Sequence, residues 1–140
     1  MAQTELQSGS RLFYRNVDYN SYGVLNVREE FARQYPAYVE RVLAAYERAR
    51  LWALQNPEEF HKLFAGNAKL DVVVVTKVLS RTDLTNSTIG NNQRQVIIAA
   101  GDVLKQNNVI NNSTDVSATV NNLIDPRYVQ DVVNKSRAQK

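Results

Sequence analysis

Apolar residues recur at spacings of three and four over most of the chain, which is the periodicity of an amphipathic helix. The pattern is clearest at residues 36–55, where it predicts one long helix. Pro36 fits the first turn, because a proline there removes no intrahelical hydrogen bond. The predicted apolar stripe consists of Val39, Val42, Leu43, Tyr46, Ala49 and Ala53. The predicted polar face carries Glu40, Arg41, Glu47 and Arg48, with Trp52 half buried at its edge.

Five shorter helices are predicted after this one. Asn56 is a candidate cap followed by a proline, which predicts a helix over residues 56–64 that stops near Gly66. The valine run within residues 71–81 also has strand propensity, but its length and helical spacing favour a helix. The other predicted helices span residues 90–107, 113–124 and 125–133, and the polar tail at 134–140 is expected to fray. The stripe of the 90–107 helix consists of Val96, Ile97, Ala100, Val103 and Leu104.

Two short β segments are predicted before the helices. Residues 11–15 and 22–27 are rich in aromatic and β-branched side chains and flank a polar loop. A lone pair of strands is marginal in water, so these strands either dock on the helices or belong to a sheet whose remainder is missing. The predicted fold class is therefore mainly α with one short strand pair.

Composition narrows the possible functions. The chain has 140 residues, a formal net charge of +3 and no cysteine. Its basic residues are mixed with acidic ones, so no nucleic-acid partner is expected. The longest apolar run, residues 72–75, is far too short for a membrane span, and the N-terminus lacks the basic and apolar regions of a secretion signal.

The residues of a catalytic or metal site are scarce in this sequence. Without cysteine there is no thiolate ligand or thiol nucleophile. The single histidine, His61, has no acidic residue or second histidine one helical turn later. We therefore expect a protein without a metal or other cofactor, and not an enzyme.

One polar loop is a candidate ligand site. Asn20, Ser21 and Tyr22 place amide, hydroxyl and phenol groups at the entry to the second predicted strand. Neutral donors of this kind bind small anions, although the same residues also form good turns.

Several longer segments together resemble one protein family. They read LFYRN at 12–16, NSYGVLNVREEF at 20–31, YP at 35–36, VLAAYERAR at 42–50 and WALQNPEE at 52–59. Later pieces are RTDL at 81–84, IG at 89–90 and LIDPRY at 123–128. This succession resembles the C-terminal part of the substrate-binding proteins of ABC importers for aliphatic sulfonates, taurine and nitrate, with the aliphatic sulfonate branch most similar.

The resemblance implies a type II periplasmic-binding fold, in which two α/β lobes close over the ligand. Residues 1–28 would end the second lobe and supply a crossing strand, and residues 29–140 would be a helical part covering the first lobe. Together they would make a single incomplete domain that lacks the upstream strands, helices and signal peptide.

The resemblance implies a small sulfonate-like anion as the ligand, held by Asn20, Ser21 and Tyr22, and an ABC permease of the inner membrane as the partner. It also implies a periplasmic or otherwise extracytoplasmic location. We also expect the open helix stripes to make the isolated chain pack as a bundle or self-associate. The alternative is a small helical interaction or scaffold module that binds no ligand.

Overall fold

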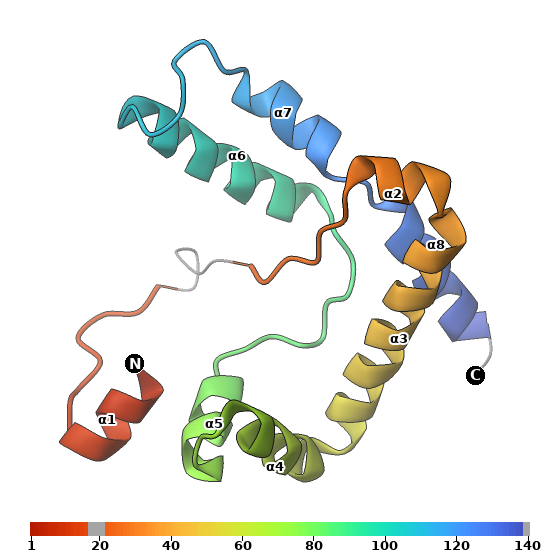
Figure 1. The fold of residues 1–140 in the computed structure, drawn as a ribbon. Helices are drawn as coiled ribbons and strands as arrows, with labels where there is room; N and C mark the ends of the chain where they lie inside the picture. Colours follow the sequence, from red (N-terminus) through yellow and green to blue (C-terminus); the bar gives the residue numbers. More distant parts are fainter. Residues whose placement is uncertain (17–21, 139–140) are drawn as a thin grey trace. The chain divides into compact units, whose positions relative to one another are not determined.

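The computed structural model describes residues 1–16 and 22–138, and within these the chain forms helices and no strands. The mainly helical class predicted from the sequence is confirmed. Figure 1 shows the helices in chain order. The chain divides into two compact units: unit 1 contains Met1–Val24 and Tyr46–Asn86, and unit 2 contains Leu25–Ala45 and Ser87–Lys140.

Unit 1 is built around α5. It contains α1 (Ala2–Ser8), the second half of α3 (Pro36–Gln55), α4 (Pro57–Ala68) and α5 (Val72–Leu79). Both α1 and α4 pack against α5. Val75 is completely buried at 0% exposure, and the other buried apolar residues of this unit are Ala2, Ala53, Ala65 and Val74. The core of unit 1 is therefore small and made of small side chains.

Unit 2 contains a helical hairpin and further helices that are linked by polar contacts. In the hairpin, α6 (Asn91–Gln106) packs against α7 (Val116–Leu123), and the Lys105 ammonium donates to the Thr114 carbonyl at 2.9 Å. Among the further helices, α8 (Arg127–Ala138) joins α2 (Glu29–Gln34) through the Tyr128 hydroxyl, which donates to the Ala32 carbonyl at 3.3 Å. The buried apolar residues are Val116, Val120, Val132 and Val133.

The predicted strands are not present in the described residues. Residues 11–15 and 22–27 run as irregular chain, and Phe13 is fully solvent-exposed. The physical reason is that a strand is stabilised by ladder hydrogen bonds and by a covered face, and neither segment has a neighbouring strand. The high strand propensity of these residues is not sufficient alone.

Most helices lie where the sequence predicts them, but several boundaries differ. The helix predicted to stop near Gly66 continues to Ala68, and it ends where Lys69 adopts the left-handed conformation at φ 54°. The helix predicted over 71–81 is shorter, at Val72–Leu79. The tail expected to fray from residue 134 is helical to Ala138. Helices α1 and α2 are not among the elements that the sequence pattern predicts.

The predicted apolar stripes of α3 and α6 remain largely open. Val42 is 48% exposed and Tyr46 is 60% exposed on α3, while Glu47, predicted to face solvent, is buried. In α6 no residue is buried, and Val103 is 55% exposed. The periodicity identified apolar faces correctly, but the structure supplies little to cover them. Within the described residues, no helix has the length and apolar character needed to cross a membrane.

Candidate functional site

The predicted ligand loop is only partly described by the structure. Asn20 and Ser21 lie outside the described residues. Tyr22 lies in irregular chain and is 44% exposed. The role of these three residues in binding an anion therefore stays a prediction.

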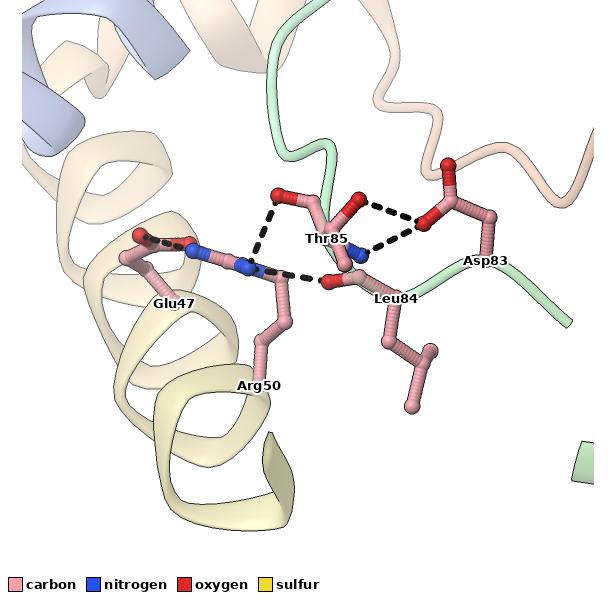
Figure 2. Close-up of polar contacts among 5 residues, drawn as sticks. All are labelled: Glu47, Arg50, Asp83, Leu84 and Thr85. Atoms are coloured by element: carbon pink, nitrogen blue, oxygen red, sulfur yellow. Dashed lines mark hydrogen bonds and ion pairs between the residues drawn. The ribbon is translucent and has the colours of Figure 1, made fainter. Parts of the chain in front are cut away.

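The polar cluster with the lowest exposure in unit 1 is the pair of Glu47 and Arg50, drawn in Figure 2. The two residues lie one turn apart on α3, where side chains three positions apart are neighbours. Arg50 Nε donates to Glu47 Oε2 at 2.7 Å, and Arg50 Nη2 donates to Glu47 Oε1 at 2.8 Å. The Arg50 side chain is 18% exposed and the Glu47 side chain is 8% exposed. This bidentate geometry fixes the guanidinium plane.

The same guanidinium fastens the segment after α5 to α3. Arg50 Nη1 donates to the Leu84 carbonyl at 2.9 Å and to the Thr85 carbonyl at 3.2 Å. Asp83 shapes that segment, because its Oδ1 accepts from the Thr85 backbone N–H at 2.8 Å and from the Thr85 hydroxyl at 2.6 Å. We call these five residues, Glu47, Arg50, Asp83, Leu84 and Thr85, the Arg50 clamp.

The electrostatics of the Arg50 clamp favour a structural role. The Glu47 carboxylate raises the pKa of Arg50 above its ordinary value, mainly through the hydrogen bonds between them. The Thr85 hydroxyl and then the Thr85 backbone N–H lower the pKa of Asp83. Because the Arg50 N–H groups already donate to a carboxylate and two carbonyls, the guanidinium has little capacity left for an anionic ligand.

A hollow of about 210 Å³ adjoins the Arg50 clamp and is open to solvent. His61 contributes to its lining, and His61 Nδ1 lies 3.0 Å from the Thr76 hydroxyl oxygen in a hydrogen bond. The lining residues are Ala53, Leu54, Pro57, Phe60, His61, Leu79, Thr82, Asp83, Leu84 and Thr85. An open, mainly apolar hollow of this kind encloses a ligand poorly, since binding sites for small molecules bury most of the ligand surface.

A second charged cluster joins α1 to α5. The Glu5 carboxylate accepts from Arg81 Nη1 at 2.7 Å and from Arg81 Nη2 at 2.9 Å, and Lys77 Nζ lies 3.0 Å from Glu5 Oε2. The hydrogen bonds to Arg81, and to a smaller extent the one to Lys77, lower the pKa of Glu5 to about 2. Glu5 is therefore ionised at any pH at which the protein would normally work.

Candidate metal ligands do not gather anywhere in the described residues: no group of three or more histidine, cysteine or acidic side chains is positioned to share an ion. Neither a known family, nor a curated protein, nor a solved structure matches the chain.

Sequence reasoning missed both charged clusters. The helical pattern predicts that Glu47 lies on the polar face, although an acid and a base three residues apart are a recognised helical pair. That spacing was the available signal for the Glu47–Arg50 pair. No local signal existed for the Glu5–Arg81 pair, whose members are 76 residues apart.

Proposed function

We propose that the chain is the C-terminal, helical part of the solute-binding component of an ABC importer for aliphatic sulfonates or a related small oxyanion. In this proposal the protein works in the periplasm and delivers its ligand to an inner-membrane permease. Residues 1–28 contribute the end of the second lobe and a crossing strand, and residues 29–140 cover the first lobe of a type II binding fold.

The observation that carries the proposal is the open apolar face of two long helices. Tyr38, Val42 and Tyr46 follow one another at four-residue spacing on α3 and are 54%, 48% and 60% exposed. On α6, Val103 and Leu104 are 55% and 42% exposed. Burying one such side chain is worth roughly 1.5–3 kcal/mol. Helices with faces of this kind are suited to cover a sheet, and the resemblance supplies an α/β lobe with that sheet.

The irregular segments at 11–15 and 22–27 support the same reading. Their aromatic and β-branched composition is typical of strands, and a strand needs a neighbouring strand to form. In the proposed complete protein, the sheets of the two lobes supply those neighbours. The ligand oxygens would then accept hydrogen bonds from Asn20 and Ser21, with Tyr22 forming part of the cleft wall.

A ligand titration tests this function directly. The chain is mixed with the separately prepared first lobe of an aliphatic sulfonate-binding protein and titrated calorimetrically with ethanesulfonate or taurine. The proposal predicts saturable heat that is weakened at least about tenfold by Asn20→Ala with Ser21→Ala, since a lost hydrogen bond to an anion costs roughly 1.5–3 kcal/mol. The matched control is Asn112→Ala with Ser113→Ala in unit 2, which should leave binding unchanged. Absence of heat with an assembled pair of polypeptides would contradict the proposal.

The second candidate is a helical interaction module without a small ligand. The observation that favours it is the hollow beside the Arg50 clamp, which is too open to solvent to bury most of a small ligand. This module would bind a protein through the exposed faces of α3 or α6 and would give no heat with sulfonates.

A further inference from the structure

The N-terminal helix α1 is held on α5 by a single charged side chain of its own. Glu5 is the only acidic residue in α1, and its carboxylate contacts both Lys77 and Arg81 at 2.7–3.0 Å. Glu5 is only 10% exposed, while Lys77 and Arg81 are 32% and 23% exposed. One carboxylate therefore serves two cations.

Each of the two helices also carries a buried apolar residue close in sequence to the ion pair. Ala2 lies three residues before Glu5, on the same face of α1, and is 6% exposed. Val74 lies three residues before Lys77, on the same face of α5, and is 5% exposed. Because α1 and α5 pack together, we expect these buried residues to lie beside the charged groups. We call Val74, Lys77 and Arg81 the α5 seat.

Helix α1 depends on this seat for its structure. It has seven residues, whereas an isolated helix shorter than roughly 12–15 residues is marginal in water. Gly9 ends it in the left-handed conformation at φ 66°, and residues 10–16 contain neither helix nor strand. That following segment makes two polar contacts: the Ser10 and Ser8 hydroxyls share a hydrogen bond at 2.8 Å, and Arg15 Nη2 donates to the Arg81 carbonyl at 3.4 Å. Neither contact replaces the packing that a seven-residue helix needs, so we expect release from the α5 seat to unfold α1 as well.

We propose that α1 is an autoinhibitory strap that occupies a docking site for an acidic helix of a partner protein. The seated strap shows what fits: a small apolar residue followed three positions later by a carboxylate. A partner can displace α1 because the α5 seat has two cations and α1 supplies only one carboxylate. A partner helix with two carboxylates one turn apart pairs Lys77 and Arg81 separately, whereas α1 offers both cations only Glu5.

A labelled peptide tests this docking site. The probe is residues 1–10 of this chain with Ser8→Glu, which adds a second carboxylate one turn after Glu5. Fluorescence anisotropy measures its binding to the full chain and to the Glu5→Lys variant, whose strap is repelled from the α5 seat. We expect binding to Glu5→Lys to be at least about tenfold tighter, because the wild-type strap competes intramolecularly at high effective concentration. Glu30→Lys, which changes an exposed acid, is the matched control and should behave like wild type.

Further variants keep the test decisive. In the Glu5→Lys background, adding Arg81→Ala should abolish peptide binding while amide exchange shows α4 and α5 still folded. Glu5→Gln is the milder release variant if Glu5→Lys lowers solubility, and it should bind the peptide with intermediate affinity. Equal binding to wild type and Glu5→Lys, or none to a folded Glu5→Lys chain, would overturn the proposal. Pairing of wild-type chains through exchanged α1 helices would also overturn it.

Discussion

Gly101 on α6 lies so close to Val116 on α7 that a Cβ atom at position 101 would stand 2.5 Å from Val116 Cγ1. Val116 is buried, and its β-branched side chain has few alternative rotamers. The close approach of the two helices therefore requires a glycine at this position.

Replacing this glycine should loosen the helical hairpin. We expect Gly101→Ala to lower the free energy of unfolding by about 1–2 kcal/mol, because overpacking costs more than alanine gains in helix propensity. Urea denaturation followed by circular dichroism measures the change. Gly66→Ala is the matched control: Gly66 lies inside α4 with open space around it, so alanine should stabilise by about 0.5–1 kcal/mol. Equal effects at the two positions would contradict this packing.

The Arg50 clamp should contribute measurably to the stability of unit 1. Arg50→Ala leaves the nearly buried Glu47 carboxylate and two carbonyls without the guanidinium, so we expect a loss of about 2 kcal/mol. Arg50→Lys should restore only part of it, because an ammonium lacks the planar fork. A double-mutant cycle with Glu47→Ala measures the coupling, and additive losses would show that the pair does not interact.

The start of α7 should depend on its cap. Asp115 Oδ1 accepts from the Ala118 backbone N–H at 2.9 Å, so Asp115→Ala should destabilise the protein by about 1 kcal/mol. Asp71 precedes α5 without a capping bond from its side chain, so Asp71→Ala should lower the free energy of unfolding by less than Asp115→Ala does. Thermal unfolding of the two variants measures both losses of stability. A larger loss for Asp71→Ala than for Asp115→Ala would contradict this prediction.

The contact between α1 and α5 should weaken in acid. The pKa of Glu5 is lowered from 4.5 to about 2 by its hydrogen bonds to Arg81 and Lys77, so its contribution is complete above pH 4.5 and declines as the pH falls toward 2. The stability difference between wild type and Glu5→Gln should therefore shrink over that window. Denaturation of both proteins across the window measures it. A difference that stayed constant would show that Glu5 ionisation does not stabilise the fold.

The helix positions could be predicted because their signals are local. Pro57 marks the start of α4, and Asp125 accepts from the Arg127 backbone N–H at 3.1 Å at the start of α8, as its position before a proline suggests. The prediction that the Asn56 side chain caps α4 is wrong, however. Its side-chain amide donates back to the Trp52 carbonyl at 2.9 Å and does not cap α4.

The end of α4 and the burial of Glu47 differ from the prediction for two reasons, one local and one distant in the sequence. Gly66 was expected to stop α4, but the helix continues because Lys69 supplies the left-handed residue and Leu70 N–H reaches the Ala65 carbonyl at 3.0 Å. Glu47 is buried because Arg50 pairs with it and with carbonyls of Leu84 and Thr85. Periodicity within α3 contains no information about that segment.

The candidate ligand site shows the same limit. Residue types alone single out Asn20, Ser21 and Tyr22 as hydrogen-bond donors, and only Tyr22 lies within the described residues. Whether such groups converge on an anion depends on the sheet that would carry them, and no local pattern specifies that sheet.

The most direct test of the central claim asks whether the open faces of α3 and α6 fit the first lobe of a solute-binding protein. The chain is titrated calorimetrically into the separately prepared first lobe of an aliphatic sulfonate-binding protein. We predict a one-to-one complex with a negative heat-capacity change, which marks burial of apolar surface. Tyr46→Asp or Val103→Asp should weaken it, whereas Glu58→Gln, on the exposed surface of α4, should not. A chain that forms no complex, melts cooperatively as a monomer and excludes hydrophobic dye would contradict the account.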